Sequence, residues 1–375
     1  MGIGGFVIAA IFHAEAVSGM CDDTETWSGT VVVAHYRPRW KEYYEEAIYR
    51  TEYYTENETQ YYTDSKGNSQ SRTVTVTKSR EVFDHWESET RWHNDAWDCT
   101  DTLIGQSTID QALYNDIVRQ FGQLSPFPGS RTTSEHNSRM LEGDPSDYQT
   151  VNKNNAVYPV STMKHWENKV KACPSVFSYP LVAESAGVFD YPSNSNHFQS
   201  DRLVGATGSL NILKWDQMNA RLGPTKKINI IAVGFGPTGA SQKGHLQEAK
   251  WIGGKKNDLV ITFGGGSLAK PDWCYVFGWS ESFFAKHQIE DVIMQTGAVD
   301  AAIPLIEKEV VANYTIKNWH KFDYLTVEIP TSCYWWELFA MFVVWGGWIT
   351  FAMLNDMSQG HTDTLDRYRR SFCSD

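Results

Sequence analysis

Residues 338–354 read LFAMFVVWGGWITFAML, a run of seventeen residues without a charged side chain. Three aromatic residues, Tyr334, Trp335 and Trp336, precede it. A bilayer core requires about 20 predominantly apolar residues, and Trp and Tyr are enriched at its interfaces. A buried helix of a soluble protein is the alternative, but such a helix rarely lacks a polar stripe for so long. The sequence therefore predicts a transmembrane helix over Cys333–Leu354.

Basic residues near this helix predict its orientation. The segment after it contains Arg367, Arg369 and Arg370, whereas the segment before it offers Lys321 among acidic residues. Lys and Arg close to a membrane span favour the cytoplasmic side. We therefore expect a helix at 333–355, a basic cytoplasmic tail at 356–375, and the bulk of the chain in the periplasm or outside the cell.

The first residues, MGIGGFVIAAIF, form an apolar run that is too short to span a bilayer and lacks the positively charged start of a signal peptide. Ala14-Glu15-Ala16 resembles a cleavage site. Two interpretations of residues 1–19 remain: a signal-like segment, or the end of a membrane helix that begins before Met1, in a chain that crosses the membrane twice. Either one delivers the following residues to the outer side.

Composition limits the partners. The chain carries 33 Lys and Arg against 45 Asp and Glu, a net charge of −12, and has no basic stripe, so nucleic acid is not an expected partner. Aromatic residues make up 14% of the chain, which suits a membrane-proximal or wide contact surface. We expect the membrane, other envelope or virion proteins, and a second copy of the chain in a homo-oligomer. The Tyr, Asn and Thr content also suits a phage-encoded protein.

Six dispersed cysteines form no CxxC pair, so a zinc ribbon is not predicted. If the chain upstream of the helix lies outside the membrane, four of them could form two disulfides in one of three connectivities. Structural thiols are an equal alternative. The four are Cys21, Cys99, Cys173 and Cys274.

Residues 28–98 are rich in β-branched and aromatic residues around a turn cluster, DSKGNS, at 64–69. This pattern predicts a long hairpin whose arms are polar on both faces, so that it protrudes or pairs with another chain. A helix over Tyr43–Arg50 is a local alternative. A helix is also expected from about Thr108 to Phe121, and these elements together define a β-rich hairpin domain at 20–123.

The next segment, 124–181, is rich in Pro, Ser, Asn and Gly and predicts an irregular connection. From about Val182 the pattern changes to alternating helices and strands, which predicts an α/β sandwich at 182–332. Ile228–Phe235 is a short continuous apolar run, as in a strand buried on both faces. The expected helices are Leu210–Leu222, Ala240–Ile252, Ser280–Gln295 and Val299–Asn313, and the further strands are Leu259–Phe263 and Trp273–Trp279.

Gly234–Gly239 has the GxGxxG spacing of a dinucleotide-binding loop. The next predicted strand ends in glycines without an acidic residue, and the intervening polar helix contains Gly244, which we expect to pack poorly on a sheet. A structural loop is therefore favoured, and no cofactor-binding residues are assigned. Gly253 and Gly254 with the two lysines after them are similarly expected to end a helix.

The order of these elements, with Lys227–Val233 and then Lys250–Ile261, resembles the TPM-domain family over about residues 203–313. The Trp251-Ile252-Gly253 block is the most specific part. The resemblance implies an α/β/α sandwich with a C-terminal membrane anchor. Some relatives bind a divalent metal or have phosphatase activity, which makes three acidic residues candidate metal ligands here: Asp190, Asp201 and Asp258.

We therefore predict an α+β chain with a β-rich N-terminal hairpin domain, a TPM-like α/β/α sandwich and a C-terminal transmembrane helix. The predicted function is that of a membrane-anchored, non-enzymatic interaction or structural protein, with no catalytic residue assigned. The alternative is a metal-dependent phosphatase of the TPM type.

Overall fold

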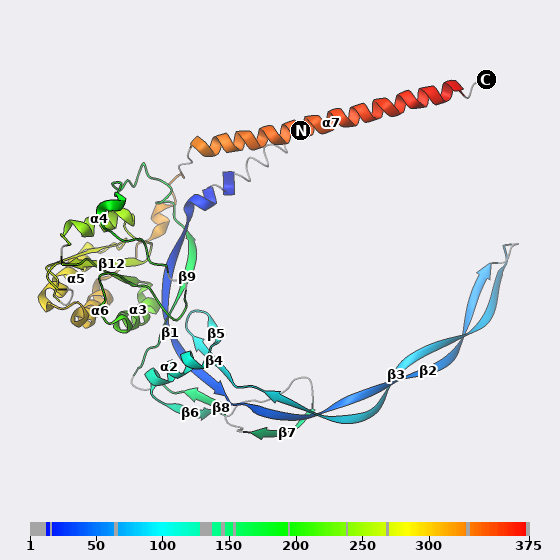
Figure 1. Cartoon of the computed structure of the whole chain (residues 1–375), viewed down its shortest axis with the longest axis horizontal. Coiled ribbons are helices and arrows are strands. Elements are labelled where there is room, and N and C mark those ends of the chain that lie inside the picture. The colour runs from blue at the N-terminus through cyan, green and yellow to red at the C-terminus, as the bar shows by residue number, and fades with distance from the viewer. Residues whose placement is uncertain are drawn as a thin grey trace. The chain divides into compact units, whose positions relative to one another are not determined.

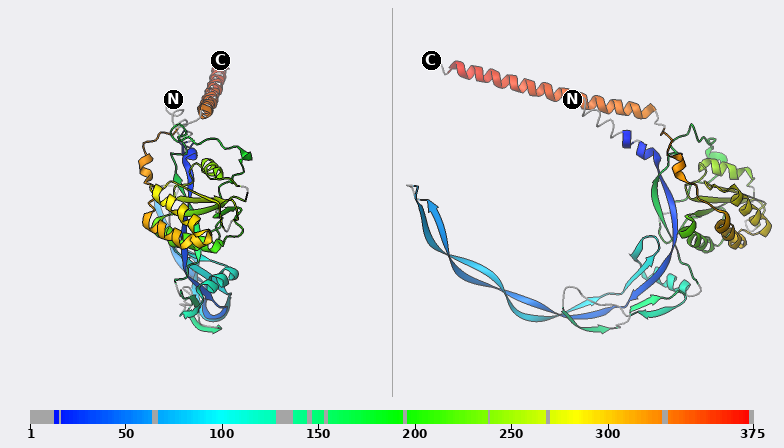
Figure 2. Two further views of the ribbon diagram at one scale, coloured as in Figure 1. Left: turned by 90° about the vertical axis from the view of Figure 1, so that its left-hand side faces the viewer. Right: turned by 180° about the vertical axis from the view of Figure 1, so that it is seen from behind.

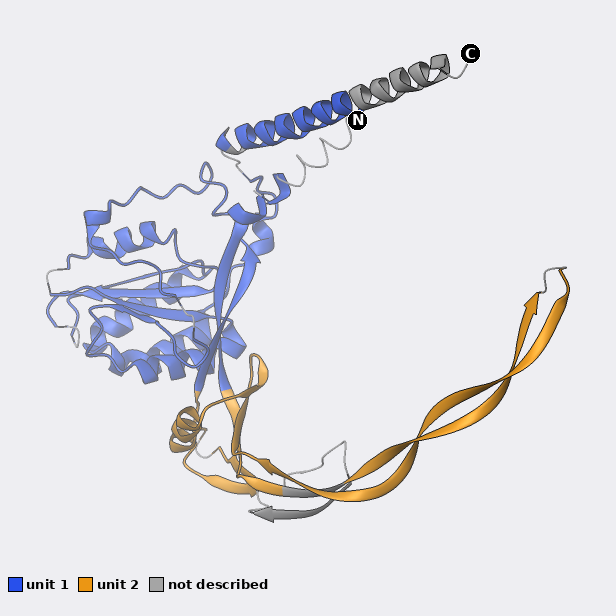
Figure 3. Ribbon diagram, turned by 45° about the vertical axis from the view of Figure 1, so that its right-hand side comes forward, with its two compact units in different colours: residues 1–30, 159–375 blue, residues 31–158 orange. Residues whose placement is uncertain are grey.

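A computed structural model gives the structure of residues 13–15, 17–63, 67–127, 137–143, 147–152, 155–193, 196–237, 239–267, 270–327 and 331–372. The chain divides into two compact units, one of residues 31–158 and one of residues 1–30 with 159–375 (Figures 1 and 3). Both contain strands and helices, so the chain is mixed α+β, as predicted. The predicted N-terminal apolar run, at 1–12, lies outside the described residues.

Strand β1 (Asp22–Arg37) explains why this division differs from the predicted boundaries near residues 123 and 181. Its first half pairs antiparallel with β9 (Pro159–Glu167), between Asp22–Glu167 and Thr30–Pro159. Its second half pairs with β4 (Ala96–Asp101). Local composition does not reveal such pairings, because the partner strands are distant in sequence.

In the unit of residues 31–158, β1 belongs to an antiparallel sheet in the order β5-β4-β1-β8-β6. Helix α2 (Gln111–Phe121) contributes buried Tyr114, Ile117 and Phe121. The helix begins later than predicted because residues before Asp110 form a strand. The Asp110 carboxylate caps the helix by accepting from the N–H of Leu113. The predicted irregular segment also contains strands, which corrects that prediction. These strands include β6 Leu124–Phe127, β7 Asn137–Gly143 and β8 Asp147–Thr150. Strand β5, Gly105–Thr108, precedes α2.

The predicted hairpin is confirmed. Strands β2 (Trp40–Thr63) and β3 (Ser69–His93) pair antiparallel along their whole length and wind around each other as a two-stranded ribbon (Figures 1 and 2). A third strand, β7, pairs with β2 as far as Glu45. The alternative of a helix over Tyr43–Arg50 is wrong, because these residues pair with β3 in strand conformation. Residues 64–66 of the predicted turn lie outside the described residues.

The other unit contains the predicted α/β sandwich. Its four-stranded sheet has the order β10-β11-β12-β13, with the first three strands parallel and β13 antiparallel to β12. The run at Ile228–Phe235 does form a strand whose residues are all buried. The bounds are β10 Leu203–Gly205, β11 Asn229–Gly234, β12 Asp258–Gly264 and β13 Trp273–Phe277.

Helices cover both faces of this sheet. Trp215, Ile289 and Ile306 represent α3, α5 and α6 in the apolar core on one face. On the other face, Trp251 at the end of α4 packs with Phe235 and other aromatic residues. The bounds are α3 Ile212–Lys226, α4 Gln242–Lys250, α5 Phe283–Thr296 and α6 Ile303–Asn313, close to those predicted.

Two predictions about these helices are wrong. Helix α3 does not stop at Gly223-Pro224, because it continues to Lys226 and ends where Lys227 adopts a left-handed conformation with φ 51°. Helix α4 does pack on the sheet, because Gly244 allows a close approach. A Cβ atom at Gly244 would lie 2.9 Å from Oγ1 of Thr262, which is closer than side chains tolerate.

Helix α7 (Thr331–Phe372) contains the predicted apolar run. Its segment Tyr334–Asn355 is long and apolar enough to cross a membrane, and none of the residues in its most apolar window is buried. It is the one helix with these properties in the described part of the chain. Length, composition and exposure are thus compatible with a membrane anchor.

Candidate functional site

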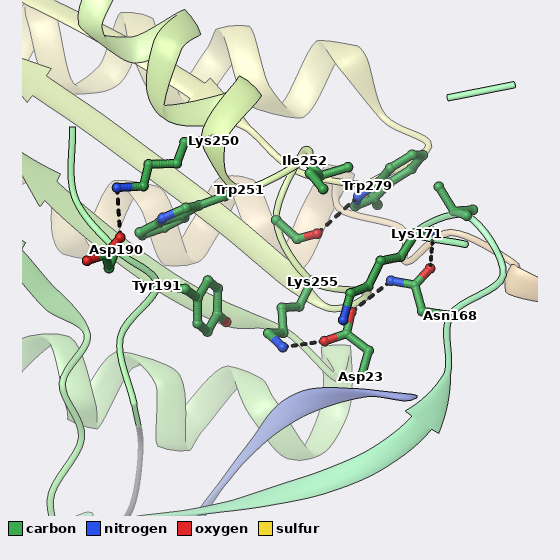
Figure 4. Close-up of a pocket in the computed structure, with 12 residues that line it drawn as sticks. Asp23, Asn168, Lys171, Asp190, Tyr191, Lys250, Trp251, Ile252, Lys255 and Trp279 are labelled. Atoms are coloured by element: carbon green, nitrogen blue, oxygen red, sulfur yellow. Dashed lines mark hydrogen bonds and ion pairs between the residues drawn. The ribbon is translucent and has the colours of Figure 1, made fainter. Parts of the chain in front are cut away.

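A pocket of about 260 Å³ opens in the α/β unit, beside the first residues of β1 (Figure 4). Its lining combines lysines, aspartates and aromatic rings. The lining residues are Asp23, Asn168, Val170, Lys171, Asp190, Tyr191, Lys250, Trp251, Ile252, Gly254, Lys255 and Trp279.

Asp23 is the best-connected polar residue of the pocket. Its carboxylate forms an ion pair with the ammonium group of Lys255 and accepts from the amide Nδ2 of Asn168 at 2.7 Å (Figure 4). Burial raises the pKa of Asp23, but the hydrogen bonds from Lys255 and Asn168 outweigh it, and the pKa lies below its ordinary value. The ammonium group of Lys255 also donates to Oγ1 of Thr24 at 2.9 Å. These contacts fix β1 to the loop before β12.

The loop between α4 and β12 forms one wall of the pocket. Ile252, Gly253 and Gly254 adopt positive φ angles of 53°, 77° and 87° in succession, which reverses the chain after α4. The prediction that these glycines end a helix is therefore confirmed. A β-branched residue with positive φ is strained, so the surrounding contacts must hold Ile252 in place. One such contact is the indole N–H of Trp279, which donates to the carbonyl of Gly254 at 3.2 Å.

A buried polar network lies behind the pocket. The Tyr191 hydroxyl donates to one carboxylate oxygen of Asp258 at 2.8 Å, and the amide of Asn229 donates to the other at 2.8 Å. Asn229 in turn accepts from the guanidinium of Arg202 at 2.9 Å. Arg202 is 1% exposed and forms an ion pair with Asp216 at 3.0 Å. Each member thus satisfies a neighbour that would otherwise be buried without a partner.

Burial shifts the pKa values of this network. It raises the pKa of Asp258 and of Asp216, although hydrogen bonds to each carboxylate act in the opposite direction. Burial and the neighbouring Asp258 carboxylate raise the pKa of Tyr191 well above its ordinary value, so the hydroxyl remains a hydrogen-bond donor at neutral pH. Burial lowers the pKa of Arg202.

Two of the three lysines that line the pocket form ion pairs with aspartates, and the third contacts a backbone carbonyl. Besides the pair of Lys255 with Asp23, Lys250 lies 2.7 Å from Asp190, and the ammonium of Lys171 donates to the carbonyl of Asp22 at 3.2 Å. Charges that are already paired add little binding energy for a charged ligand, since the pair must first be broken. The arrangement therefore favours a role in holding β1 against the sandwich.

The three predicted metal ligands have different environments. Asp190 is 93% exposed on its side chain and pairs with Lys250, and Asp201 is also exposed. Asp258 is fully buried, and its carboxylate oxygens accept from Asn229, Tyr191 and the backbone N–H of Lys255. Among the described residues no group of three His, Cys, Asp or Glu could hold a metal ion. The metal site stays a prediction, and this geometry lends it no support.

Sequence reasoning missed the residues that join distant segments. Asp23, Asn168 and Arg202 belong to no recognisable motif, and a polar residue in an amphipathic strand is usually solvated. One signal in the sequence could have indicated a buried ion pair, namely an arginine at position 202, immediately before an apolar strand. Arginine is rarely buried unless it is paired.

The prediction of two disulfides is not supported. Cys21, Cys99, Cys173 and Cys274 are free thiols, and the first three are buried. Burial raises the pKa of Cys21 and of Cys99, so both thiols are protonated at neutral pH. The alternative of structural thiols describes them better.

The glycine-rich loop after β11 lies at the carboxyl edge of the sheet, and Thr238 within it lies outside the described residues. Gly234 lies close to the preceding chain, since a Cβ atom there would approach the carbonyl of Ala206 to 2.6 Å. The end of β12 carries no acidic residue of its own, as the sequence argument stated, but Asp272 from the segment before β13 lies beside it: the N–H of Asp272 donates to the carbonyl of Gly264 at 2.9 Å. Its carboxylate lies against Gly265. The close packing accounts for these glycines without a ligand.

The β2–β3 ribbon is the second candidate site, as an interaction surface. Beyond Glu45 none of its described residues is buried. Rings of Tyr49 and Phe83 lie 6.2 Å apart between centroids, and those of Phe83 and Trp86 lie 5.6 Å apart. Soluble monomers rarely leave connected aromatic side chains exposed unless the surface serves in binding. The exposed aromatic residues of the ribbon are Tyr49, Tyr53, Tyr54, Tyr61, Tyr62, Phe83, Trp86 and Trp92.

Comparison of the sequence with protein-family models and with curated proteins, and of the structure with solved structures, finds no match. The resemblance to the TPM domain therefore rests on the sequence blocks alone and stays a prediction.

Proposed function

We propose that this chain is a membrane-anchored interaction or structural protein without enzymatic activity, which displays the hairpin and the α/β sandwich on the outer side of a membrane. The observation that carries the proposal is the apolar segment Tyr334–Asn355 of α7, whose most apolar window is not buried by any part of the chain. The exposed ribbon adds the surface through which such a protein would act.

The surface of α7 supports lipid as its environment. Fourteen large apolar or aromatic residues between Tyr334 and Leu354 are exposed, among them Trp335 at 69% and Phe342 at 76%. Soluble proteins rarely expose a continuous apolar patch of more than a few hundred Å². Each of these side chains would gain roughly 1.5–3 kcal/mol by leaving water, so insertion of the helix into lipid would remove a large unfavourable exposure of apolar surface.

The proposed topology follows from the arginines after the helix. With Arg367, Arg369 and Arg370 in the cytoplasm, the preceding chain faces the periplasm or the exterior. Partners there would be other envelope proteins or, if the chain is phage-encoded, virion proteins. The ion pairs of the pocket and the exposed ribbon together favour contact over catalysis.

The first test is membrane association with protease accessibility. The chain with a C-terminal tag should stay in the membrane pellet after carbonate extraction. Protease added to intact spheroplasts should digest all but a small tagged fragment that includes the helix. Release by carbonate would reject the anchor, and protection of the whole chain would reverse the proposed orientation.

The second test shortens the ribbon without changing its register. Tyr53 pairs with Ser79, so replacing the residues between them by Asn-Gly leaves a hairpin with a two-residue turn. We expect this variant to remain in the membrane but to lose the partners that chemical cross-linking captures with the natural chain. Capture of the same partners by both forms would reject the ribbon as the interaction surface.

The alternative of a metal-dependent phosphatase rests on the TPM resemblance. It predicts hydrolysis of a general phosphatase substrate with Mg²⁺ or Ca²⁺, abolished by Asp258→Asn. The matched control is Asp272→Asn, which changes another aspartate of the same unit outside the predicted ligand set. Metal-dependent turnover that is lost in the first variant alone would replace the non-enzymatic proposal.

A further inference from the structure

We propose that the β2–β3 ribbon docks onto the ribbon of a second copy of this chain, through one defined face. This rests on the proposed function as an interaction protein and adds the partner and the surface. The face consists of alternate residues of β2 and the β3 residues opposite them, and we call it the neutral face. Its members are Tyr49, Thr51, Tyr53, Thr55, Asn57, Thr59, Tyr61 and Thr63 with Phe83, Glu81, Ser79, Thr77, Thr75, Thr73, Ser71 and Ser69.

Pairing places these residues on one side, because directly opposed residues of an antiparallel pair share a face and successive residues alternate. All sixteen are exposed. Glu81 is the one member that carries a charge, and the others are hydroxyl, amide or aromatic side chains. Such a surface can be covered with little desolvation of charge, which is the main obstacle to burying a polar strand face.

The opposite face of the ribbon carries many charged side chains, and these already form ion pairs within the ribbon. Its acidic and basic side chains pair with one another: Glu52 lies 3.1 Å from Arg80 on the opposite strand and 2.9 Å from Arg50 on its own strand. Lys78 on β3 forms ion pairs with Glu56 at 2.9 Å and with Glu58 at 2.5 Å, both on β2. The tyrosines of this face are covered by cations, with the guanidinium of Arg80 over the ring of Tyr54 at 5.5 Å. Its polar groups therefore have partners, whereas the rings of the neutral face remain open.

The tyrosines allow a direct comparison. Tyr54 is 40% exposed and stacks with Arg80, whereas its neighbour Tyr53 on the neutral face is 75% exposed and makes no ring or cation contact with any described residue. The same holds for Tyr62, which is 50% exposed beneath Arg72, and Tyr61, which is 80% exposed. Large rigid side chains with a polar tip are the residues that binding surfaces favour.

Charge argues that the partner is a second copy. Residues 49–83 contain five Lys or Arg and five Asp or Glu, so this part of the ribbon is neutral in a chain whose net charge is −12. A strongly acidic or basic partner would find no complementary field on it. Two copies of the neutral face bring only their two Glu81 side chains into the interface as charges. Hydroxyl groups both donate and accept hydrogen bonds, so a face of Thr, Ser and Tyr is complementary to itself.

The area of the neutral face and the low stability of a single ribbon both favour docking of two copies. Tyr49–Thr63 spans about 50 Å at about 3.4 Å per residue, and two strands are about 10 Å wide, which gives about 500 Å² per copy and about 1,000 Å² in all. Specific interfaces begin near that size. The aromatic rings of Phe83 and Trp86 extend the surface at one end. A two-stranded ribbon is at best marginally stable by itself in water, so a second layer would stabilise it.

The experiment uses the full chain in membranes, with a benzophenone-bearing amino acid in place of Tyr53 or, as the matched control, Tyr54. Illumination should give a product of twice the 42.6 kDa chain mass from position 53 and little from position 54. Mixing two differently tagged forms should place both tags in that product. A product with a different protein at position 53, or equal yields at both positions, would overturn the proposal.

A second measurement compares charge insertions on the two faces. In the detergent-solubilised chain, Tyr53→Asp with Tyr61→Asp should weaken self-association about 100-fold, because like charges are opposed across the interface. Tyr54→Asp with Tyr62→Asp should leave it nearly unchanged, and light scattering measures both. Unchanged association of the first variant would also overturn the proposal. Carbonate extraction of the same variants reports the anchor separately, so failure of self-docking and failure of membrane attachment are distinguished.

Discussion

The ribbon β2–β3 and the sheet β10–β13 are both built from strands, yet they obtain their order in different ways. In the sheet, Ile231, Val260 and their neighbours are buried between two layers of helices, and apolar residues fill both faces. In the ribbon no described residue beyond Glu45 is buried, and order comes from cross-strand pairs and backbone hydrogen bonds. The sequence of a strand thus indicates its environment: strands of the buried sheet are continuous apolar runs, whereas strands of the exposed ribbon are rich in polar residues.

The comparison predicts where substitutions matter. A buried polar group in the sandwich has no water to replace a lost partner, whereas an exposed group in the ribbon does. The largest effects should therefore come from the network at the start of the parallel strands, and the smallest from ion pairs of the ribbon.

Arg202→Met is expected to have the largest effect. It leaves the largely buried carboxylate of Asp216 without its cation and removes a donor to Asn229, which costs about 3–5 kcal/mol in the free energy of unfolding. The matched control is Arg221→Met, which breaks the exposed pair with Glu307 and should cost less than about 1 kcal/mol. Urea unfolding of the full chain, followed by far-UV circular dichroism, measures both.

The pH dependence of this variant sharpens the test. Burial raises the pKa of Asp216 in the folded chain, and loss of Arg202 raises it further. A carboxyl whose folded pKa is raised stabilises the fold below its unfolded pKa near 4, and that stability is lost as the pH rises through the folded pKa. The cost of Arg202→Met should therefore grow between about pH 4 and pH 7. An equal cost at both values would mean that the Asp216 charge is not the cause.

Asp23→Asn should have the next largest effect, with the opposite dependence on pH. The folded pKa of Asp23 is lowered, so its contribution is present above its unfolded pKa near 4 and is lost as the pH falls through the folded pKa. The variant should lose about 1.5–3 kcal/mol at pH 7, the range for hydrogen bonds to charged groups. As the pH falls below about 4, the difference in stability from the natural chain should shrink steadily. A constant difference across this range would contradict the ion pair with Lys255.

The sequence predicted most of the sandwich and the ribbon, because local periodicity reports how many faces of an element are buried. Ile228–Phe235 could be recognised as a buried strand from its own residues. The contact of Asp23 with Lys255 could not, since the two are 232 positions apart and neither belongs to a repeating pattern. Gly244 was misread for a related reason: a glycine in a helix weakens it locally, and only the sheet beneath reveals that a larger residue would not fit.

Gly244→Ala tests that interpretation. An added methyl group would lie 2.9 Å from Oγ1 of Thr262 and from the ring of Tyr275, so α4 must move and stability should fall by about 1–3 kcal/mol. The control is Gly236→Ala, where nothing lies within 4 Å of the added atom. Thermal unfolding of both variants decides the point. If Gly244→Ala were the more stable of the two, helix propensity rather than close packing would govern α4.

Glu52→Gln in the ribbon should have the smallest effect, even though Glu52 lies within hydrogen-bond distance of both Arg50 and Arg80. Hydrogen bonds from Arg80 and Arg50 lower its pKa, but the group is solvated and water replaces both partners when it is neutralised. We expect the unfolding midpoint of Glu52→Gln to match that of the natural chain and to respond less to added salt. A large loss of stability would mean that the charged face is shielded from water, and that the second copy covers this face of the ribbon and not the neutral one.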